Sequence, residues 1–311
     1  MASRSLGTYD YVIVGAGTAG CVLANRLSAD RDVNVLLIEA GGKDNYFWIR
    51  VPVGYLYTIG NPRTDWCYKT EAEEGLNGRS IGYARGKVLG GCSSINAMIH
   101  MRGQRGDYDH WAELGNRGWS WDEVLPYFKR TENYVHGADA LHGTGGELRV
   151  EERRVSWEIL DAWREAAAEC GIPKIVEFNR GDNFGNAYFQ VNQRRGVRWS
   201  ATNAFLRPVL HRRNLKVMTR ASALRVRVAT RENIKRATGV ELRSPRRWLT
   251  WKYALPKLSP RLNSVIFGMP HSSAASRQAS RISQLTRRSS TRSSPPTPCS
   301  SSLRERNPPR G

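Results

Sequence analysis

The chain has 311 residues, of which 40% are hydrophobic, enough for a packed core in one large domain or two ordinary ones. The formal net charge of +20 is unevenly distributed, because residues 243–311 contain fourteen Lys and Arg residues and a single acid, Glu305. The first 242 residues are therefore only mildly basic, so the total charge does not by itself define a nucleic-acid-binding body.

The cysteine pattern and the first residues indicate the compartment. The cysteines form no C-x-x-C pair, which fits reduced thiols better than a disulfide framework or a zinc site; they are Cys21, Cys67, Cys92, Cys170 and Cys299. Residues 1–8 are too few and too polar for a signal peptide, and no apolar run approaches the length of a membrane span. We expect a cytoplasmic protein without a transmembrane segment.

The first forty residues contain a strand, a glycine turn and a helix in that order. Residues 10–14 (D-Y-V-I-V) predict a buried strand, because β-branched and aromatic residues precede a chain-breaking glycine. Gly15 permits a tight turn, Gly17 lets the backbone approach a pyrophosphate, and Gly20 lets the helix pack closely on the strand. The helix would direct its first N–H groups toward the phosphates.

A second predicted strand, residues 35–38, ends at Glu39, nineteen residues after Gly20. An acid at this place can accept hydrogen bonds from a ribose 2′-OH and would repel a 2′-phosphate. A glycine triplet alone is weak evidence, but all these features in order predict dinucleotide binding. The unit does not separate FAD from NAD.

A second glycine-rich stretch, residues 85–102, has small residues from Gly90 to Ser94, followed by a more apolar segment that favours a helix. Such a turn exposes backbone N–H groups, so Gly90, Gly91, Ser93 and Ser94 could approach a phosphate or a planar ring. A plain flexible turn explains the same residues equally well.

Helices and strands are also expected further along the chain. Ser120 and Glu123 form a capping box for a helix that buries Val124, Leu125 and Phe128. Ser156 is expected to cap a second helix that ends at Gly171. We interpret the apolar face of that helix as core: Ile159, Leu160, Trp163, Ala167 and Cys170. Strands are predicted at residues 215–219, 224–228 and 238–242.

The chain resembles the glucose-methanol-choline oxidoreductases, and among them the choline dehydrogenase and alcohol dehydrogenase branch. Beside the glycine turn, the resemblance rests on six stretches in unbroken order: T-D-W-C-Y-K-T from Thr64, G-L-N-G-R-S from Gly75, R-G-K-V-L-G-G from Arg85, D-Y-D-H-W-A-E-L from Asp107, H-G-T-G-G-E-L-R-V from His142, and R-W-S-A-T-N-A-F-L-R-P from Arg198. It continues to Leu242, which is roughly three quarters of the chain.

The resemblance implies an FAD enzyme that oxidises alcohols of the choline or alkanol type, with an electron acceptor that the sequence does not identify. The fold class implied is α/β, a Rossmann-like FAD-binding domain with a parallel sheet and helices, plus part of a substrate cap; the C-terminal half of the family fold is missing. Some relatives bind FAD covalently through a histidine directly before the motif asparagine. Here that position is Ile95, so non-covalent FAD is expected.

The cofactor-binding residues implied by the resemblance and the motifs form four groups. The glycine turn would meet the pyrophosphate, Glu39 the ribose, Val88 and residues 96–99 the ring system, and the backbone of Ala223 the adenine. The whole set is Gly15, Gly17, Thr18, Ala19, Gly20, Glu39, Arg85, Val88, Gly90, Gly91, Ser93, Asn96, Ala97, Met98, Ile99 and Ala223.

No histidine has a sequence context typical of a catalytic base or a metal ligand, and each is interpreted as structural or solvated: His100, His110, His136, His142, His211 and His271. In the family that the chain resembles, the base is a histidine near the C-terminus with a second histidine or an asparagine. The sequence stops before that region. We therefore assign no catalytic residue and no metal ligand, and expect little alcohol dehydrogenase activity.

We place a domain boundary after Leu242, giving an FAD-binding region at 1–242 and a basic tail at 243–311 rich in Arg, Ser and Pro. The tail has too little apolar surface to offset the entropy of ordering it. It could be a nucleic-acid-binding arm, an ordinary disordered tail or an out-of-frame translation. We favour the last, because the resemblance ends where further strands are expected, and we expect no specific nucleic-acid partner. The alternative functions are a non-enzymatic FAD-binding fragment and nucleic-acid binding through the tail.

Overall fold

The computed structural model describes residues 5–181, 183–231, 234–244 and 247–250. The chain divides into two compact units, Met1–Gly268 and Met269–Gly311, and all described residues lie in the first. Most of the basic tail falls outside the described residues, so the predictions made for it remain predictions. Within the described residues, no helix is long and apolar enough to cross a membrane.

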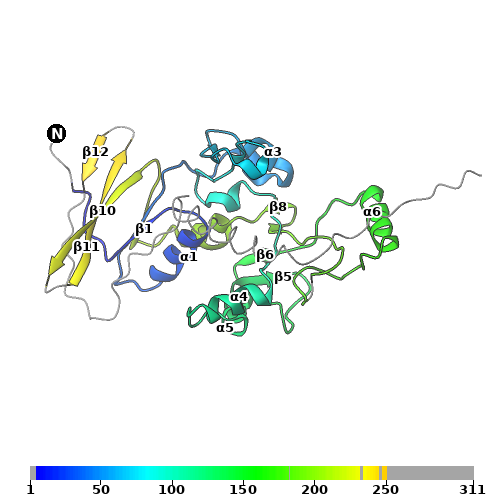
Figure 1. Cartoon of the computed structure of the whole chain (residues 1–311). Helices are drawn as coiled ribbons and strands as arrows, with labels where there is room; N and C mark the ends of the chain where they lie inside the picture. The colour runs from blue at the N-terminus through cyan, green and yellow to red at the C-terminus, as the bar shows by residue number, and fades with distance from the viewer. Residues whose placement is uncertain (1–4, 182, 232–233, 245–246, 251–311) are drawn as a thin grey trace, which may run out of the picture. The chain divides into compact units, whose positions relative to one another are not determined.

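A three-stranded parallel sheet forms from the strands β1 (Tyr11–Val14), β2 (Val35–Ile38) and β9 (Leu215–Met218), in the order β1-β2-β9. Figure 1 labels β1 of this sheet. The helix α1 (Thr18–Leu27) connects β1 to β2, as the sequence predicts. All four side chains of β2 are buried, because this strand is central and apolar on both faces. The predicted parallel nucleotide-binding sheet is confirmed in these strands.

One hydrophobic cluster packs α1 on this sheet. Ile13 and Leu37 of the strands contact Ala24 of the helix, together with Phe205 and Leu206. The last two belong to η4 (Thr202–Leu206), which continues into η5 (Arg207–Val209). A chain segment nearly two hundred residues away is thus part of the same core, and the buried Asn25 amide fixes it by donating to the Phe205 carbonyl at 2.7 Å.

A second sheet is antiparallel and contains β10 (Ser222–Arg231), β11 (Ile234–Ser244) and β12 (Arg247–Thr250). Val240 and Leu242 of this sheet pack with Leu36 and Ile38 of the central strand. The strands predicted at 224–228 and 238–242 are confirmed and run longer than predicted. β12 lies beyond residue 242, where we placed the boundary.

The segment between the two glycine stretches contains short elements where loop was expected: α2 (Phe47–Arg50), η1 (Pro52–Gly54), α3 (Tyr55–Thr58), β3 (Tyr68–Lys69), η2 (Glu74–Leu76) and β4 (Gly82–Tyr83). After η3 (Gly91–Ser94) the predicted helix is absent. The chain there is irregular, and Ile99 forms an isolated bridge with Val191. The helix prediction was wrong because the backbone here pairs with a distant segment: the Asn192 N–H donates to the Met98 carbonyl oxygen at 2.8 Å, and the His100 N–H to the Gln190 carbonyl oxygen at 2.9 Å.

The next helices are α4 (Arg105–Glu113) and α5 (Trp121–Thr131). The Ser120–Glu123 capping box is confirmed, with the Ser120 N–H donating to the Glu123 carboxylate at 3.1 Å. Val124, Leu125 and Phe128 are only half-buried, which corrects the prediction that they are buried. α5 leads directly into β5 (Glu132–Tyr134), which pairs in parallel with β6 (Leu148–Val150).

The helix α6 (Glu158–Glu169) differs from its prediction in two respects. Its N-cap is Trp157 rather than Ser156, and no side chain caps it. Ile159 is 60% exposed and Trp163 72% exposed, so the face interpreted as core is open among the described residues. Helical periodicity identifies which face is apolar, but it does not specify what covers that face. The remaining strands are β7 (Gln193–Arg194) and β8 (Val197–Arg198).

Candidate functional site

The turn between β1 and α1 has the backbone geometry that its three glycines suggest. Gly15 has a φ of +94°, a left-handed conformation that favours glycine. A Cβ on Gly20 would lie 1.9 Å from the Gly15 carbonyl oxygen, so only glycine allows this helix-to-strand approach. A Cβ on Gly17, in contrast, would meet nothing within 4 Å. The turn is tight on its inner side and open at Gly17.

The second glycine stretch meets the first, although seventy residues separate them. Gly90 donates its N–H to the Ala16 carbonyl oxygen at 2.7 Å, and a Cβ on Gly91 would lie 2.8 Å from the Gly17 Cα. Both residues have positive φ angles, +87° for Gly90 and +54° for Gly91. Backbone contact this close requires glycine. The second glycine stretch therefore has a defined packing role that a plain flexible turn would not have. We call Gly15–Gly20 and Gly90–Gly91 together the glycine seat.

The N-terminus of α1 opens onto this seat. The first amide with an acceptor in the helix is that of Cys21, which donates to the Gly17 carbonyl oxygen at 2.9 Å. Earlier amides in a helix have no such acceptor, and the first turn of α1 contains no acid. Thr18 and Ala19 are exposed here. An anion is therefore favoured at this end of the helix by both hydrogen bonding and the helix dipole.

Glu39 follows β2 at the edge of the seat and is buried. Its carboxylate accepts N–H hydrogen bonds from Ala16 at 2.8 Å and Gly41 at 2.7 Å. Burial raises the pKa of Glu39, although these hydrogen bonds act in the opposite direction. In the structure the carboxylate thus holds the turn in place, and its contact with a ribose stays a prediction.

The segment after Gly91 is held by Arg198, whose importance the sequence reasoning missed. This guanidinium is 1% exposed; it donates from Nε to the Ile49 carbonyl oxygen at 2.8 Å. Its Nη1 donates to the Ser93 carbonyl oxygen at 3.2 Å and to Asn96 Oδ1 at 2.9 Å. Ser93 also accepts, at its Oγ, the N–H of Ala201 at 3.0 Å. Burial lowers the pKa of Arg198 to about 10, so it remains a cation at neutral pH.

The other predicted residues occupy varied environments. Val88 is 1% exposed and packs with Ile49 and Ile95, while the Arg85 guanidinium lies 3.7 Å from the centre of the Tyr83 ring. Met98 is buried with a φ of +64°. Ala97 and Ile99 are exposed, and Ala223 packs with the cluster that contains Ile38. The structure directly joins the two glycine stretches, and it joins Ser93 to Asn96 through Arg198.

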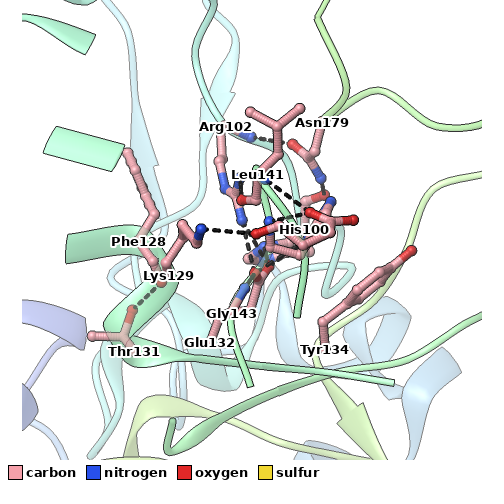
Figure 2. Close-up of polar contacts among 12 residues, drawn as sticks. His100, Arg102, Phe128, Lys129, Thr131, Glu132, Tyr134, Leu141, Gly143 and Asn179 are labelled. Carbon is pink, nitrogen blue, oxygen red and sulfur yellow. Dashed lines mark hydrogen bonds and ion pairs between the residues drawn. The ribbon is translucent and has the colours of Figure 1, made fainter. Parts of the chain in front are cut away.

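A second group of polar residues, largely buried, begins at His100 and includes residues as far along the chain as Glu177. We call it the Glu132 cluster: His100, Arg102, Glu132, Tyr134, His142 and Glu177. Figure 2 labels the first four of these residues. Arg102 Nη2 donates to both oxygens of Glu132 at 2.9 Å, and His100 Nε2 lies 3.0 Å from Glu132 Oε1. The His142 ring, fully buried, lies between Glu132 at 3.2 Å and Glu177 at 2.6 Å.

Charges within this cluster stabilise one another. Burial acts to raise the pKa of Glu132, but hydrogen bonds from His100, His142 and the Gly143 N–H, with the Arg102 charge, place it well below its usual range. Burial acts to lower the pKa of His142, yet the two glutamates raise it above its ordinary value. The cluster is therefore an internally balanced ionic network.

Most of the described histidines contact a glutamate, and their assignment as structural or solvated stays a prediction. Of the described histidines, four have a glutamate as hydrogen-bond partner: His100, His110, His136 and His142. None of these four belongs to the glycine seat. Among the described residues, no group of three or more His, Cys, Asp or Glu side chains is arranged to hold a metal ion. The sequence contains the H-G-T-G-G stretch but gives no sign that its histidine lies between two acids.

The parallel sheet and glycine seat define a dinucleotide-binding protein of the Rossmann type. The GMC oxidoreductase model matches residues 9–254, more than half of the chain, so the chain belongs to the GMC oxidoreductase family.

Comparison with known proteins adds relatives with stated activities. The chain is 40% identical over 240 residues to an oxygen-dependent choline dehydrogenase of Photobacterium profundum, covering 76% of this chain and 41% of the relative. It is 41% identical over 219 residues to an alcohol dehydrogenase [acceptor] of Pseudomonas putida, covering 70% and 40%. It is also similar to the solved structure of pyridoxine 4-oxidase from Mesorbium loti, with 36% identity and a TM-score of 0.74, covering 79% and 48%. The chain spans about two fifths of the curated relatives' length.

Proposed function

We propose that this chain binds FAD non-covalently as the nucleotide-binding portion of an alcohol oxidoreductase. The observation that carries the proposal is the contact between Gly91 and Gly17, where backbone meets backbone beside an open face. A pyrophosphate needs this combination of a close-approaching backbone and free amides at a helix N-terminus.

The described residues fit FAD at several points. Gly15, Gly17 and Gly20, with the first amides of α1, would hold the pyrophosphate, and Glu39 at the end of β2 would face the ribose. Ser93 and the segment 96–99 would lie along the ring system. Ile95 is buried against Ile49 and Val88, so this position offers no nucleophile for a covalent bond.

Bound FAD would supply the hydride-accepting ring, and a protein base would remove the proton of an alcohol hydroxyl. His100 and His142 are both engaged by Glu132, at 3.0 Å and 3.2 Å, and His142 also by Glu177 at 2.6 Å. We therefore expect the chain to bind FAD while alcohols reduce it slowly. A positioned general base contributes about 10²- to 10⁴-fold in rate. The substrate is proposed as an alcohol of the choline or alkanol type, with an electron acceptor still to be identified. The four described free thiols support a cytoplasmic location.

Replacing Gly17 tests this proposal, because a side chain there enters open space and should not disturb the fold. We expect Gly17→Val to remove FAD binding, measured as quenching of flavin fluorescence on titration with the purified chain. Gly75→Val is the matched control: a Cβ there also meets nothing within 4 Å, and the site is in η2, outside the glycine seat. FAD binding by Gly17→Val equal to that of wild type and Gly75→Val would refute the proposal.

A further inference from the structure

Arg198 is a buried cation with no anionic partner among the described residues. Its three acceptors are two backbone carbonyl oxygens, of Ile49 and Ser93, and the neutral amide oxygen of Asn96. No Asp or Glu within the described ranges lies within 4.0 Å of its guanidinium nitrogens. Across the same described ranges, the buried Nη2 has no hydrogen-bond partner.

Burying an unpaired cation costs free energy unless other interactions replace those it made with water. A charge removed from water needs an opposite charge or a full set of hydrogen bonds, and a buried arginine is ordinarily paired. Arg198 has only part of that set. The missing counter-charge is consistent with an anion that arrives with a ligand, since a ligand's charge would then interact favourably across a water-poor interior.

The contacts of Arg198 indicate which part of a ligand it serves. Gly91, at the start of η3, contacts Gly17 and so lies at the proposed pyrophosphate position. Arg198 instead contacts Ser93 and Asn96, at the end of this segment and beyond it, toward the residues expected along the ring system. Asn96 Oδ1 also accepts the Met98 N–H at 3.0 Å, so one amide connects Arg198 to the segment 96–99.

We propose that Arg198 is the positioning residue of the flavin ring: it fixes the turn from Ser93 to Asn96 and supplies the positive charge that favours the reduced ring. This inference rests on the proposed function. A flavin ring that takes up two electrons and one proton, as it does on accepting a hydride, becomes an anion. That anion would supply the negative partner that Arg198 does not have among the described residues.

Three variants of the full chain test this. Arg198→Met removes the charge, Arg198→Lys keeps it without the planar fork, and Asn96→Asp places a carboxylate beside Nη1 while keeping both hydrogen-bond acceptor roles. Each is loaded with FAD, and the potential of the bound FAD is measured by dithionite reduction against a reference dye. The affinities of the apo-chains for FAD and for ADP are measured in parallel.

We expect Arg198→Met and Asn96→Asp to lose at least tenfold in preference for reduced over oxidised FAD, which is a fall of about 30 mV for a two-electron couple. Arg198→Lys should retain most of the wild-type potential but bind FAD more weakly, because it loses the fork in which Nε holds Ile49 while Nη1 holds Ser93 and Asn96. ADP affinity should stay within about twofold of wild type in all three, since ADP lacks the ring.

The outcomes separate the alternatives. An unchanged potential in Asn96→Asp, which preserves the packing even if Arg198→Met does not fold, overturns the inference. A parallel loss of ADP affinity also overturns it, because it assigns the charge to the pyrophosphate. Failure of the wild-type chain to bind either FAD or ADP refutes the proposed function itself, and the present inference with it.

Discussion

Arg102 and Arg198 are both buried, at 5% and 1% exposed, yet their partners differ in charge. Arg102 forms a two-oxygen ion pair with Glu132, inside a cluster that also contains two histidines. Arg198 contacts only neutral acceptors. The comparison distinguishes a charge that stabilises the fold from one whose partner is expected to be the cofactor.

The difference between the two arginines should have its largest effect on the free energy of unfolding. Arg102→Met leaves Glu132 buried with less compensation, so it should lower the free energy of unfolding by about 3–5 kcal/mol. Arg198→Met leaves no uncompensated anion, since its partners are neutral, so it should lower it by only about 1–2 kcal/mol. Urea unfolding of both variants, followed by circular dichroism, measures the difference.

His136→Gln provides the control for this pair of variants. His136 is hydrogen-bonded to Glu152 at 3.2 Å, but both side chains are about half exposed. An exposed pair contributes roughly 0–1 kcal/mol, so this variant should unfold nearly as wild type does. Equal destabilisation by Arg102→Met and Arg198→Met would show that the two arginines play the same structural part.

A smaller effect is expected in the pH dependence of stability. The pKa of Glu132 is lowered in the fold, so its stabilisation is complete above the unfolded value of about 4.3 and is lost as the pH falls toward the folded value. The pKa of His142 is raised, so its stabilisation is complete below about 6.5 and is lost as the pH rises through the folded value. The cluster therefore contributes most between about pH 4.5 and 6.5.

Melting temperatures measured from pH 4 to 9 check this prediction. Wild type should lose stability above about pH 6.5, with about 1.4 kcal/mol for each unit by which the pKa of His142 exceeds its unfolded value. His142→Gln has no titrating group at this position and should lack that decline. The prediction is wrong if both proteins show the same slope above pH 6.5.

A feature of the fold or the site could be predicted from the sequence when residues close together in the chain determine it. The turn at Gly15, Gly17 and Gly20 was predictable, because strand, turn and helix are set by neighbouring residues. That Gly91 contacts Gly17 was not predictable from spacing. The resemblance named both stretches, but only folding brings them together.

Buried charges were harder to predict. Arg198 and His142 are far in sequence from several of their partners, and nothing in the local pattern distinguishes a buried arginine from an exposed one. The apolar face of α6 shows the same limit, because Trp163 fits a core pattern but is exposed. Periodicity describes one element, whereas burial depends on what packs against it.

We propose that the two glycine stretches form one FAD-binding seat. Calorimetric titration of the wild-type chain with FAD, followed by competition with ADP, tests it most directly. We expect saturation at one FAD per chain and displacement by ADP, because both ligands share the pyrophosphate that the seat would hold. Absence of saturable FAD binding by the folded chain, or FAD binding that ADP does not compete, would contradict it.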